Sequence, residues 1–69
     1  MPLIFSDPGV EQTVKRVGGT GEVRQHLADL GFTAGAAVTV ISAIGGNVIV
    51  RVMDSRVAIS KEMAQKIFV

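Results

Sequence analysis

Turn-forming residues interrupt this 69-residue chain at short intervals. They are Pro8-Gly9, Gly18-Gly19, Gly31, Gly35 and Gly45-Gly46. Glycine accepts the positive φ that tight turns require, and proline fixes φ at the start of a turn. Only short strands and short helices fit between these positions. No apolar stretch reaches the roughly 18 residues that a membrane-spanning helix needs, so we expect a small domain without direct membrane insertion.

Length and composition limit the classes of protein that the chain can form. A chain of this size has one core, so residues 1–69 are expected to be a single domain. Hydrophobic residues make up 48% of it, and no cysteine is present, so folding depends on apolar packing and no thiolate site can form. The net charge of +1 is too small to attract a polyanion. The N-terminus lacks the pattern of a secretory signal, which predicts a cytoplasmic protein.

The first half of the chain predicts an arm, a strand and a helix. Met1 to Phe5 is expected to be an extended arm, and Gln12 to Val17 the first strand. From Thr20, a helical N-cap, apolar residues recur at helical spacing as Val23, Leu27 and Leu30. Gly31 is placed to adopt the left-handed conformation that ends a helix, with Phe32 folding back onto Leu27.

The second half predicts two hairpins. Ala37 to Ile44 is rich in β-branched residues, and Gly45-Gly46-Asn47 is typical of a tight loop that leads into a strand from Val48 to Met53. A two-residue turn at Asp54-Ser55 would pair Met53 with Arg56 and Val52 with Val57. Ser60 is expected to cap a one-turn helix, and Phe68 and Val69 to form a last short strand.

This hairpin pairing separates two faces. The predicted core-facing residues are Val50, Val52, Val57 and Ile59. The predicted outward-facing residues are Ile49, Arg51, Met53, Arg56 and Ala58. The elements together predict a mainly β fold, a small SH3-like, partly open β-barrel of about five strands, with one helix after the first strand and a short C-terminal helix. An OB-fold is the structural alternative.

The order and spacing of these features resemble the family of ferrous iron transport protein A, FeoA. The residues that carry the resemblance are Pro8-Gly9, Gly18-Gly19, Arg24 through Leu30-Gly31-Phe32, Gly35, Val38 to Val40, Gly45-Gly46-Asn47, Arg56-Val57-Ala58-Ile59, and Ala64 to Ile67 with Val69. No single motif is specific, but the resemblance covers nearly the whole chain. Ser60 stands where family members often have a basic residue, so a basic contact is not transferred to that position.

The resemblance implies an SH3-like accessory protein of a membrane ferrous iron transporter that carries a cytosolic GTPase domain. It implies no catalytic residues and no cofactor, so we expect a protein that acts by contact and is not an enzyme. Two alternatives stay open. One is a regulatory module like the C-terminal domain of metal-dependent transcription repressors, and the other is a small nucleic-acid-binding barrel, which the lack of Tyr and Trp disfavours.

Individual residues give few signs of chemistry. His26 is the only imidazole, and a boundary position on the helix fits it better than a metal ligand. Asp29 and Asp54 are expected in a helix end and a turn, which aspartate favours anyway. Gly18-Gly19-Thr20-Gly21 lacks the Gly-Lys-Ser/Thr ending of a phosphate-binding loop. No catalytic, cofactor or metal site is therefore predicted.

An interaction surface is the remaining candidate. Ile49, Arg51, Met53 and Arg56 share the predicted outer face, and Arg24 on the helix could extend it. Apolar side chains beside arginines suit a protein contact, although singly exposed apolar residues are ordinary on small domains. The predicted partner is the iron transporter, with a homo-oligomer left open and nucleic acid not expected.

Overall fold

A computed structural model describes all of residues 1–69 and shows a mainly β domain. The elements, in chain order, are a 3₁₀ helix η1 (Leu3–Phe5), β1 (Glu11–Thr13), β2 (Arg16–Val17), α1 (Gly21–Asp29), β3 (Ala37–Ile44), β4 (Asn47–Val52), β5 (Ser55–Ser60), α2 (Lys61–Ala64) and β6 (Ile67–Phe68). The structure has six strands where about five were predicted, and both α helices lie where they were predicted.

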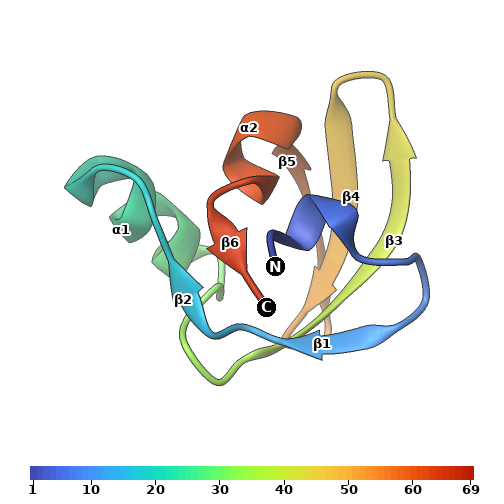
Figure 1. Ribbon diagram of the computed structural model, residues 1–69, viewed down its shortest axis with the longest axis horizontal. Coiled ribbons are helices and arrows are strands. Elements are labelled where there is room, and N and C mark those ends of the chain that lie inside the picture. Colours follow the sequence, from blue (N-terminus) through green and yellow to red (C-terminus); the bar gives the residue numbers. More distant parts are fainter.

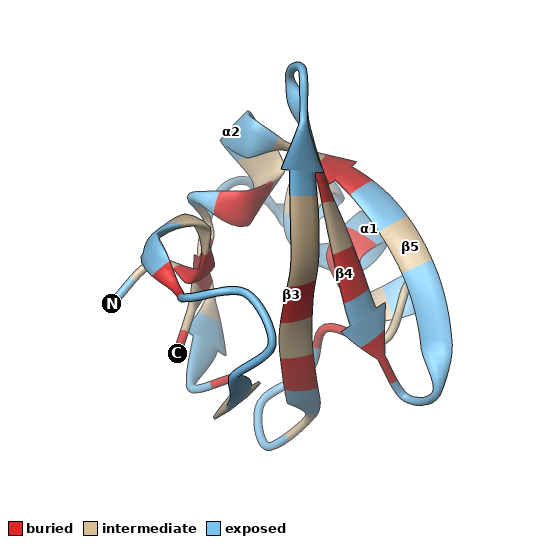
Figure 2. Ribbon diagram, turned by 90° about the vertical axis from the view of Figure 1, so that its right-hand side faces the viewer, coloured by how far each residue is buried: buried red, intermediate tan, exposed pale blue.

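The strands form two open antiparallel sheets (Figure 1). Four strands are arranged in the order β1-β3-β4-β5, and β2 pairs with β6 in a separate two-stranded sheet. Along β4 and the first half of β3, buried residues alternate with more exposed ones (Figure 2). One face of the larger sheet is therefore packed against the core, and the opposite face is turned to the outside.

The core is a single cluster of thirteen buried apolar residues. They are Leu3, Val14, Leu27, Phe32, Val38, Val40, Val48, Val50, Val52, Ile59, Ala64, Ile67 and Val69. Every strand of the larger sheet except β1 contributes to it, together with both α helices. Val57 is half-buried and packs against its margin.

The N-terminal segment was predicted as an extended arm, and that prediction was wrong. Residues Leu3–Phe5 form a 3₁₀ turn, and the side chain of Leu3 is fully buried in the core. The two chain ends pair with each other, because the Val69 N–H donates to the Met1 carbonyl over 2.8 Å and the Met1 ammonium donates to the Val69 carbonyl over 3.0 Å. Burial of Leu3 and this pairing fix the segment in place.

The predicted first strand, Gln12 to Val17, is divided into β1 and β2. Val14 lies between them with 1% of its surface exposed, and its N–H donates to the Ala36 carbonyl over 2.9 Å. The next N–H, that of Lys15, donates to the Phe68 carbonyl over 2.7 Å. The chain therefore passes from one sheet to the other at Val14, and a strand that is continuous in the sequence pattern serves both sheets.

Helix α1 begins and ends as predicted. The Val23 N–H donates to the Thr20 hydroxyl oxygen over 3.3 Å at its start. At its end, Gly31 has φ of +107°, and the Phe32 N–H donates to the Leu27 carbonyl over 2.9 Å. The Gly31 N–H donates to the Ala28 carbonyl over 3.0 Å, which completes a Schellman motif. Ser60 likewise caps α2, since it accepts the Met63 N–H over 3.2 Å.

The pairing of β4 with β5 differs from the predicted one by two residues. The turn consists of Met53 and Asp54, so β4 ends at Val52, which pairs with Ser55. Val50 therefore lies opposite Val57, and Arg51 lies opposite Arg56. Both turn residues have positive φ, +50° and +63°, as a type I′ turn requires, and such a turn matches the twist of the two strands.

The shift by two leaves the assignment of the two faces intact. Side chains alternate with a period of two, so moving the partner by two residues returns each side chain to its original face. Val48, Val50, Val52 and Ile59 are buried as a result, while Arg51 and Arg56 are exposed. In the β3–β4 hairpin, Val38 and Val40 lie opposite Val52 and Val50, and a bulge between Val40 and Ser42 shifts the register of the pairs beyond it by one residue.

The helix stop at Gly31 gives a stability prediction. Gly31→Val should lower the free energy of unfolding by more than about 1 kcal/mol, because a β-branched residue resists positive φ. A Cβ at this position would also lie 3.2 Å from the Met53 sulfur. Chemical denaturation of both proteins measures the difference.

Gly21→Ala is the matched control for this variant. Gly21 opens α1 without positive φ, and nothing lies within 4 Å of the Cβ that alanine would add. That variant should keep or slightly raise the stability. Equal stability of Gly31→Val and the parent would contradict the role of the Schellman motif.

Candidate interaction surface

The outer face of the four-stranded sheet brings two arginines together. We use "outer face" for the side that carries Ile49, Arg51, Arg56 and Ala58, which are opposed in pairs across β4 and β5. Arg51 and Arg56, the arginine pair, are direct neighbours in adjacent strands. Because the Val52–Ser55 pair flanks a two-residue turn, Arg51 and Arg56 occupy a non-hydrogen-bonded pair, where side chains lie closest.

Opposed like charges destabilise a sheet, and this pair is only partly compensated. The Arg51 guanidinium lies 3.6 Å from a carboxylate oxygen of Asp54, but both side chains are largely exposed, at 62% and 96%. Exposed ion pairs of this kind contribute little to stability. The Arg51–Asp54 contact is the only ion pair between side chains in the structure, so Arg56 has no carboxylate partner.

Met53 lies beside the arginine pair in a strained conformation. Positive φ costs a residue other than glycine roughly 1–2 kcal/mol, and Met53 has neither the flexibility of glycine nor the short polar side chain of aspartate. Its side chain is 71% exposed. The sulfur passes over Gly31, the glycine that ends α1. Burial of the Met53 side chain therefore compensates little for the unfavourable backbone conformation of this residue.

An open pocket of about 410 Å³ adjoins this end of the sheet. Its lining residues are Glu11, Ala37, Thr39, Arg51, Met53 and Asp54. Glu11, Thr39 and Arg51 follow one another across β1, β3 and β4 in register. The pocket therefore forms part of the outer face and presents polar and charged groups of both signs.

The remaining predicted interface residues, Ile49 and Arg24, differ in exposure and in the element that carries them. Ile49 lies on the outer face as predicted, but it is half-buried. Ile44, which the sequence reasoning did not single out, is 65% exposed at the end of β3. Arg24 is exposed on α1, a different element from the sheet. The structure thus brings Arg51, Met53 and Arg56 together, with Ile49 beside them, and does not join Arg24 to this group by any ion pair or hydrogen bond.

The residues weighed as metal ligands are dispersed. His26 is exposed in the last turn of α1. Asp29 accepts a hydrogen bond from the Gln25 side-chain amide over 2.9 Å, and Asp54 faces Arg51. No three side chains of the His, Cys, Asp and Glu types gather where they could hold a metal ion.

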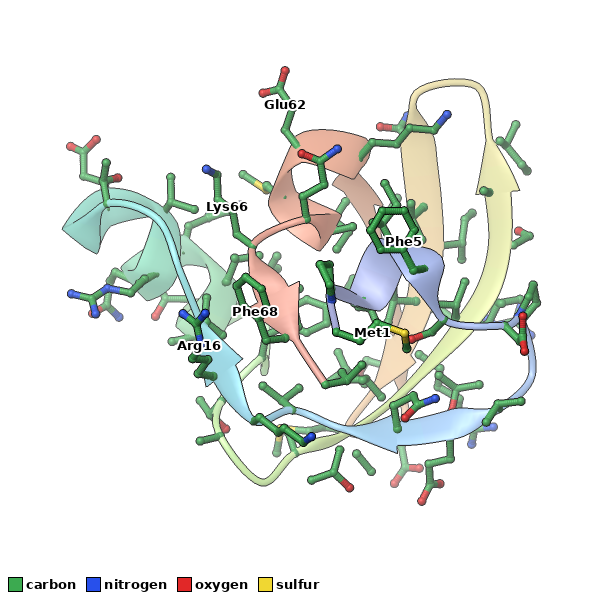
Figure 3. All side chains as sticks on the ribbon, viewed as in Figure 1. Met1, Phe5, Arg16, Glu62, Lys66 and Phe68 are labelled. Carbon is green, nitrogen blue, oxygen red and sulfur yellow. The ribbon has the colours of Figure 1, made fainter.

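A second apolar surface lies around the chain ends and was missed in the sequence. Met1 and Phe5 are 55% and 70% exposed, and the Arg16 guanidinium stacks 4.0 Å from the centre of the Phe68 ring. Figure 3 shows these residues on the side of the molecule that carries both termini. The predicted extended arm gave no reason to place Phe5 on a surface, because its position depends on burial of Leu3 in the neighbouring turn.

The FeoA domain, as a sequence family, matches this chain over residues 1–69. The chain belongs to the FeoA family. An iron(II) transport protein A of Methanocaldococcus jannaschii is 34% identical over 68 residues, which cover 99% of this chain and 83% of the relative. A crystal structure of an iron uptake regulatory protein, also a FeoA, is 31% identical, with a TM-score of 0.88 over 97% of this chain and 91% of that one.

Two more distant structures share the fold. A zinc-complexed FeoA of Stenotrophomonas maltophilia, described as a prokaryotic SH3 domain protein, has a TM-score of 0.85 at 22% identity, over 99% of this chain and 87% of that one. A manganese-dependent transcriptional repressor has a TM-score of 0.90 at 21% identity, over all of this chain and 40% of that one. The predicted FeoA family and SH3-like fold are confirmed.

As a member of the FeoA family, the chain is an accessory domain of ferrous iron transport. Neither of its α helices has the length and hydropathy that crossing a bilayer requires. The outer face and the adjoining turn offer two guanidiniums, an exposed thioether and neighbouring apolar side chains.

Met53→Asn should raise the free energy of unfolding, by up to about 1 kcal/mol. Asparagine tolerates positive φ, so the substitution relieves backbone strain, and it removes little buried surface. Thermal or urea denaturation measures the change, with Asp54→Asn as the control at a position that aspartate already suits. A clear loss of stability in Met53→Asn would show that the contact of Met53 with Gly31 outweighs the strain.

The isolated domain should bind ferrous ion weakly or not at all. Its single imidazole is exposed on a helix, and no cluster of ligand side chains surrounds it. Anaerobic calorimetry with ferrous ion tests this. A stoichiometric site of micromolar affinity that disappears in His26→Ala would contradict the prediction.

Proposed function

We propose that this FeoA-family protein assists ferrous iron transport by binding the cytosolic GTPase domain of the membrane transporter through its outer face. Family membership and the iron transport names of its relatives support the setting. The observation that carries the choice of surface is the arginine pair beside exposed Met53. Arginine and methionine are both enriched in protein interfaces relative to other surfaces.

The energetics of the outer face favour a role in recognition. Arg51 and Arg56 repel each other in the free domain, and Met53 holds an unfavourable backbone conformation. Costs of this kind persist where the residues serve a function other than folding. A partner that supplies carboxylates and covers the thioether would relieve the charge repulsion and remove apolar surface from water.

In this proposal the protein is a non-enzymatic cytoplasmic factor. Its cytoplasmic location follows from that of the GTPase domain that it binds. It affects transport by protein contact alone. The relative from Stenotrophomonas maltophilia is described as a candidate activating factor of ferrous iron transport. A contact that changes the rate of nucleotide hydrolysis by the partner fits that description.

A regulatory module of the repressor type is the second candidate. The shared fold with the manganese-dependent repressor favours it, but this likeness at 21% identity concerns the fold alone. Such a module would bind within its own repressor chain and not to a transporter. Binding to the GTPase domain in solution separates the two candidates.

The double variant Met53→Asp/Arg56→Glu should stay folded and lose binding to the transporter's cytosolic domain by at least tenfold. Both side chains are exposed, and the substitutions replace apolar surface and positive charge by negative charge. Isothermal titration measures the affinity, and circular dichroism verifies the fold.

Two controls give this test its meaning. Arg24→Glu makes a similar change of charge on α1, away from the sheet, and should bind like the parent. Val52→Asp places a carboxylate where 1% of the surface is exposed and should unfold the domain. A folded Met53→Asp/Arg56→Glu protein that binds with the parent's affinity would exclude the outer face. Loss of binding in Arg24→Glu alone would move the interface to α1.

A further inference from the structure

The outer edge of β5 has backbone groups without partners. β5 is the last strand of the order β1-β3-β4-β5, and nothing is paired with its far side (Figure 2). The Lys61 N–H donates to the Gly46 carbonyl over 3.1 Å, which continues the β4–β5 ladder by one step. Residues that bond to β4 alternate with residues that point away. Because Lys61 bonds to the β4 side, Ser55, Val57 and Ile59, which precede it at intervals of two, also direct their backbone groups toward β4.

Arg56 and Ala58 consequently direct their backbone N–H and C=O groups away from the sheet. Neither residue takes part in a backbone hydrogen bond outside the helices and strands. Both are exposed, and Ala58 adds only a methyl group that could obstruct an approaching chain. Sheet edges are usually protected by proline, bulges or a covering segment, and β5 has a single charged residue, Arg56, between its two terminal serines.

The charge next to this edge determines which chain could pair with it. A residue added opposite Arg56 would lie on the outer face, beside the arginine pair. Arg56 lacks a carboxylate partner, and the weak contact of Arg51 with Asp54 leaves the pair with net positive charge. Opposite-charge pairs across strands stabilise a sheet, whereas a further basic residue would add to the repulsion.

The position opposite Val57 would lie on the core side. Val57 is half-buried at the margin of the core, so an apolar residue beside it would extend the packed surface. The edge of β5 thus favours an alternation of acidic and apolar residues. A second copy of this chain does not fit, because β5 paired with itself would gather four arginines on one continuous face.

We propose that the free edge of β5 binds an extended acidic segment of a partner protein as an additional strand. Backbone hydrogen bonds to Arg56 and Ala58 supply the pairing, and a carboxylate opposite Arg56 lies against the arginine pair. An apolar residue next to it packs beside Val57. This inference deepens the proposed function and rests on it only for the identity of the protein that carries the segment.

A short peptide that alternates glutamate with valine tests the site directly, with a lysine–valine peptide of the same length as its control. Titrated into the ¹⁵N-labelled full chain, the acidic peptide should shift the amide signals of β5 and slow hydrogen exchange at Arg56 and Ala58. Salt should weaken the binding. Arg56→Gln should weaken it by about fivefold, the size of one good exposed charge pair.

Ala58→Pro removes the outward N–H without removing a bond to β4, and should abolish binding of the peptide. Ala58→Ser keeps the N–H and should bind like the parent. If Ala58→Pro does not fold, hydrogen exchange of the parent with the acidic peptide tests the strand site by itself. Protection of the Arg56 and Ala58 amides supports the site, and its absence contradicts it.

Several results would overturn the proposal. The lysine–valine peptide could bind as tightly as the acidic one, or the acidic peptide could bind without protecting the Arg56 and Ala58 amides. Inorganic phosphate alone could also produce the same amide shifts, which would indicate a bare anion site. Self-association that protects the same two amides would identify a second copy as the occupant and overturn it as well.

Binding measurements with the transporter's GTPase domain distinguish failure of the strand site from failure of the proposed function. If the GTPase domain binds Ala58→Pro as well as it binds the parent, and the peptide fails to bind, the strand site is wrong and the proposed function stands. If the peptide binds as described and the GTPase domain does not bind at all, the proposed partner is wrong and the strand site stands.

Discussion

Strand β4 is the element on which the rest of the structure depends. It is the only strand with a valine at every core-facing position, and Val48, Val50 and Val52 are each at most 2% exposed. It pairs with β3 on one side and β5 on the other, so its alternation sets the faces of both neighbours. Burial of these three side chains contributes roughly 1.5–3 kcal/mol each, a large part of what a domain of this size can gain.

The same alternation creates the outer face. Where β4 buries its valines, the intervening residues must point outward, and Arg51 is one of them. The turn at Met53 and Asp54 then decides which residue of β5 lies opposite Arg51, and the answer is Arg56. A turn of two residues with positive φ thus converts two separated arginines into an adjacent pair, at the cost of an unfavourable backbone conformation at Met53.

The sequence predicted the parts of the fold that local chemistry determines. Thr20, Gly31 and Ser60 mark helix boundaries by capping, and the faces of β4 and β5 follow from alternation. The register of that hairpin could not be predicted in the same way, because a shift of two residues keeps every side chain on its face. Asp54-Ser55 is also better turn chemistry than Met53-Asp54. The break at Val14 and the burial of Leu3 depend on contacts with Ala36 and the C-terminus, which are distant in the sequence. The arginine pair therefore emerged only from the structure.

β5 and the arginine pair form the surface through which we propose that this FeoA-family protein binds its partner. The most direct measurement is amide hydrogen exchange of the full chain, alone and in complex with the transporter's cytosolic GTPase domain. We expect new protection at Arg56 and Ala58, whose amides have no partner in the free domain, with the amides of Leu3, Ile4 and Phe5 unchanged. Protection confined to the surface around Phe5 and Phe68, with Arg56 and Ala58 exchanging as in the free protein, would contradict it.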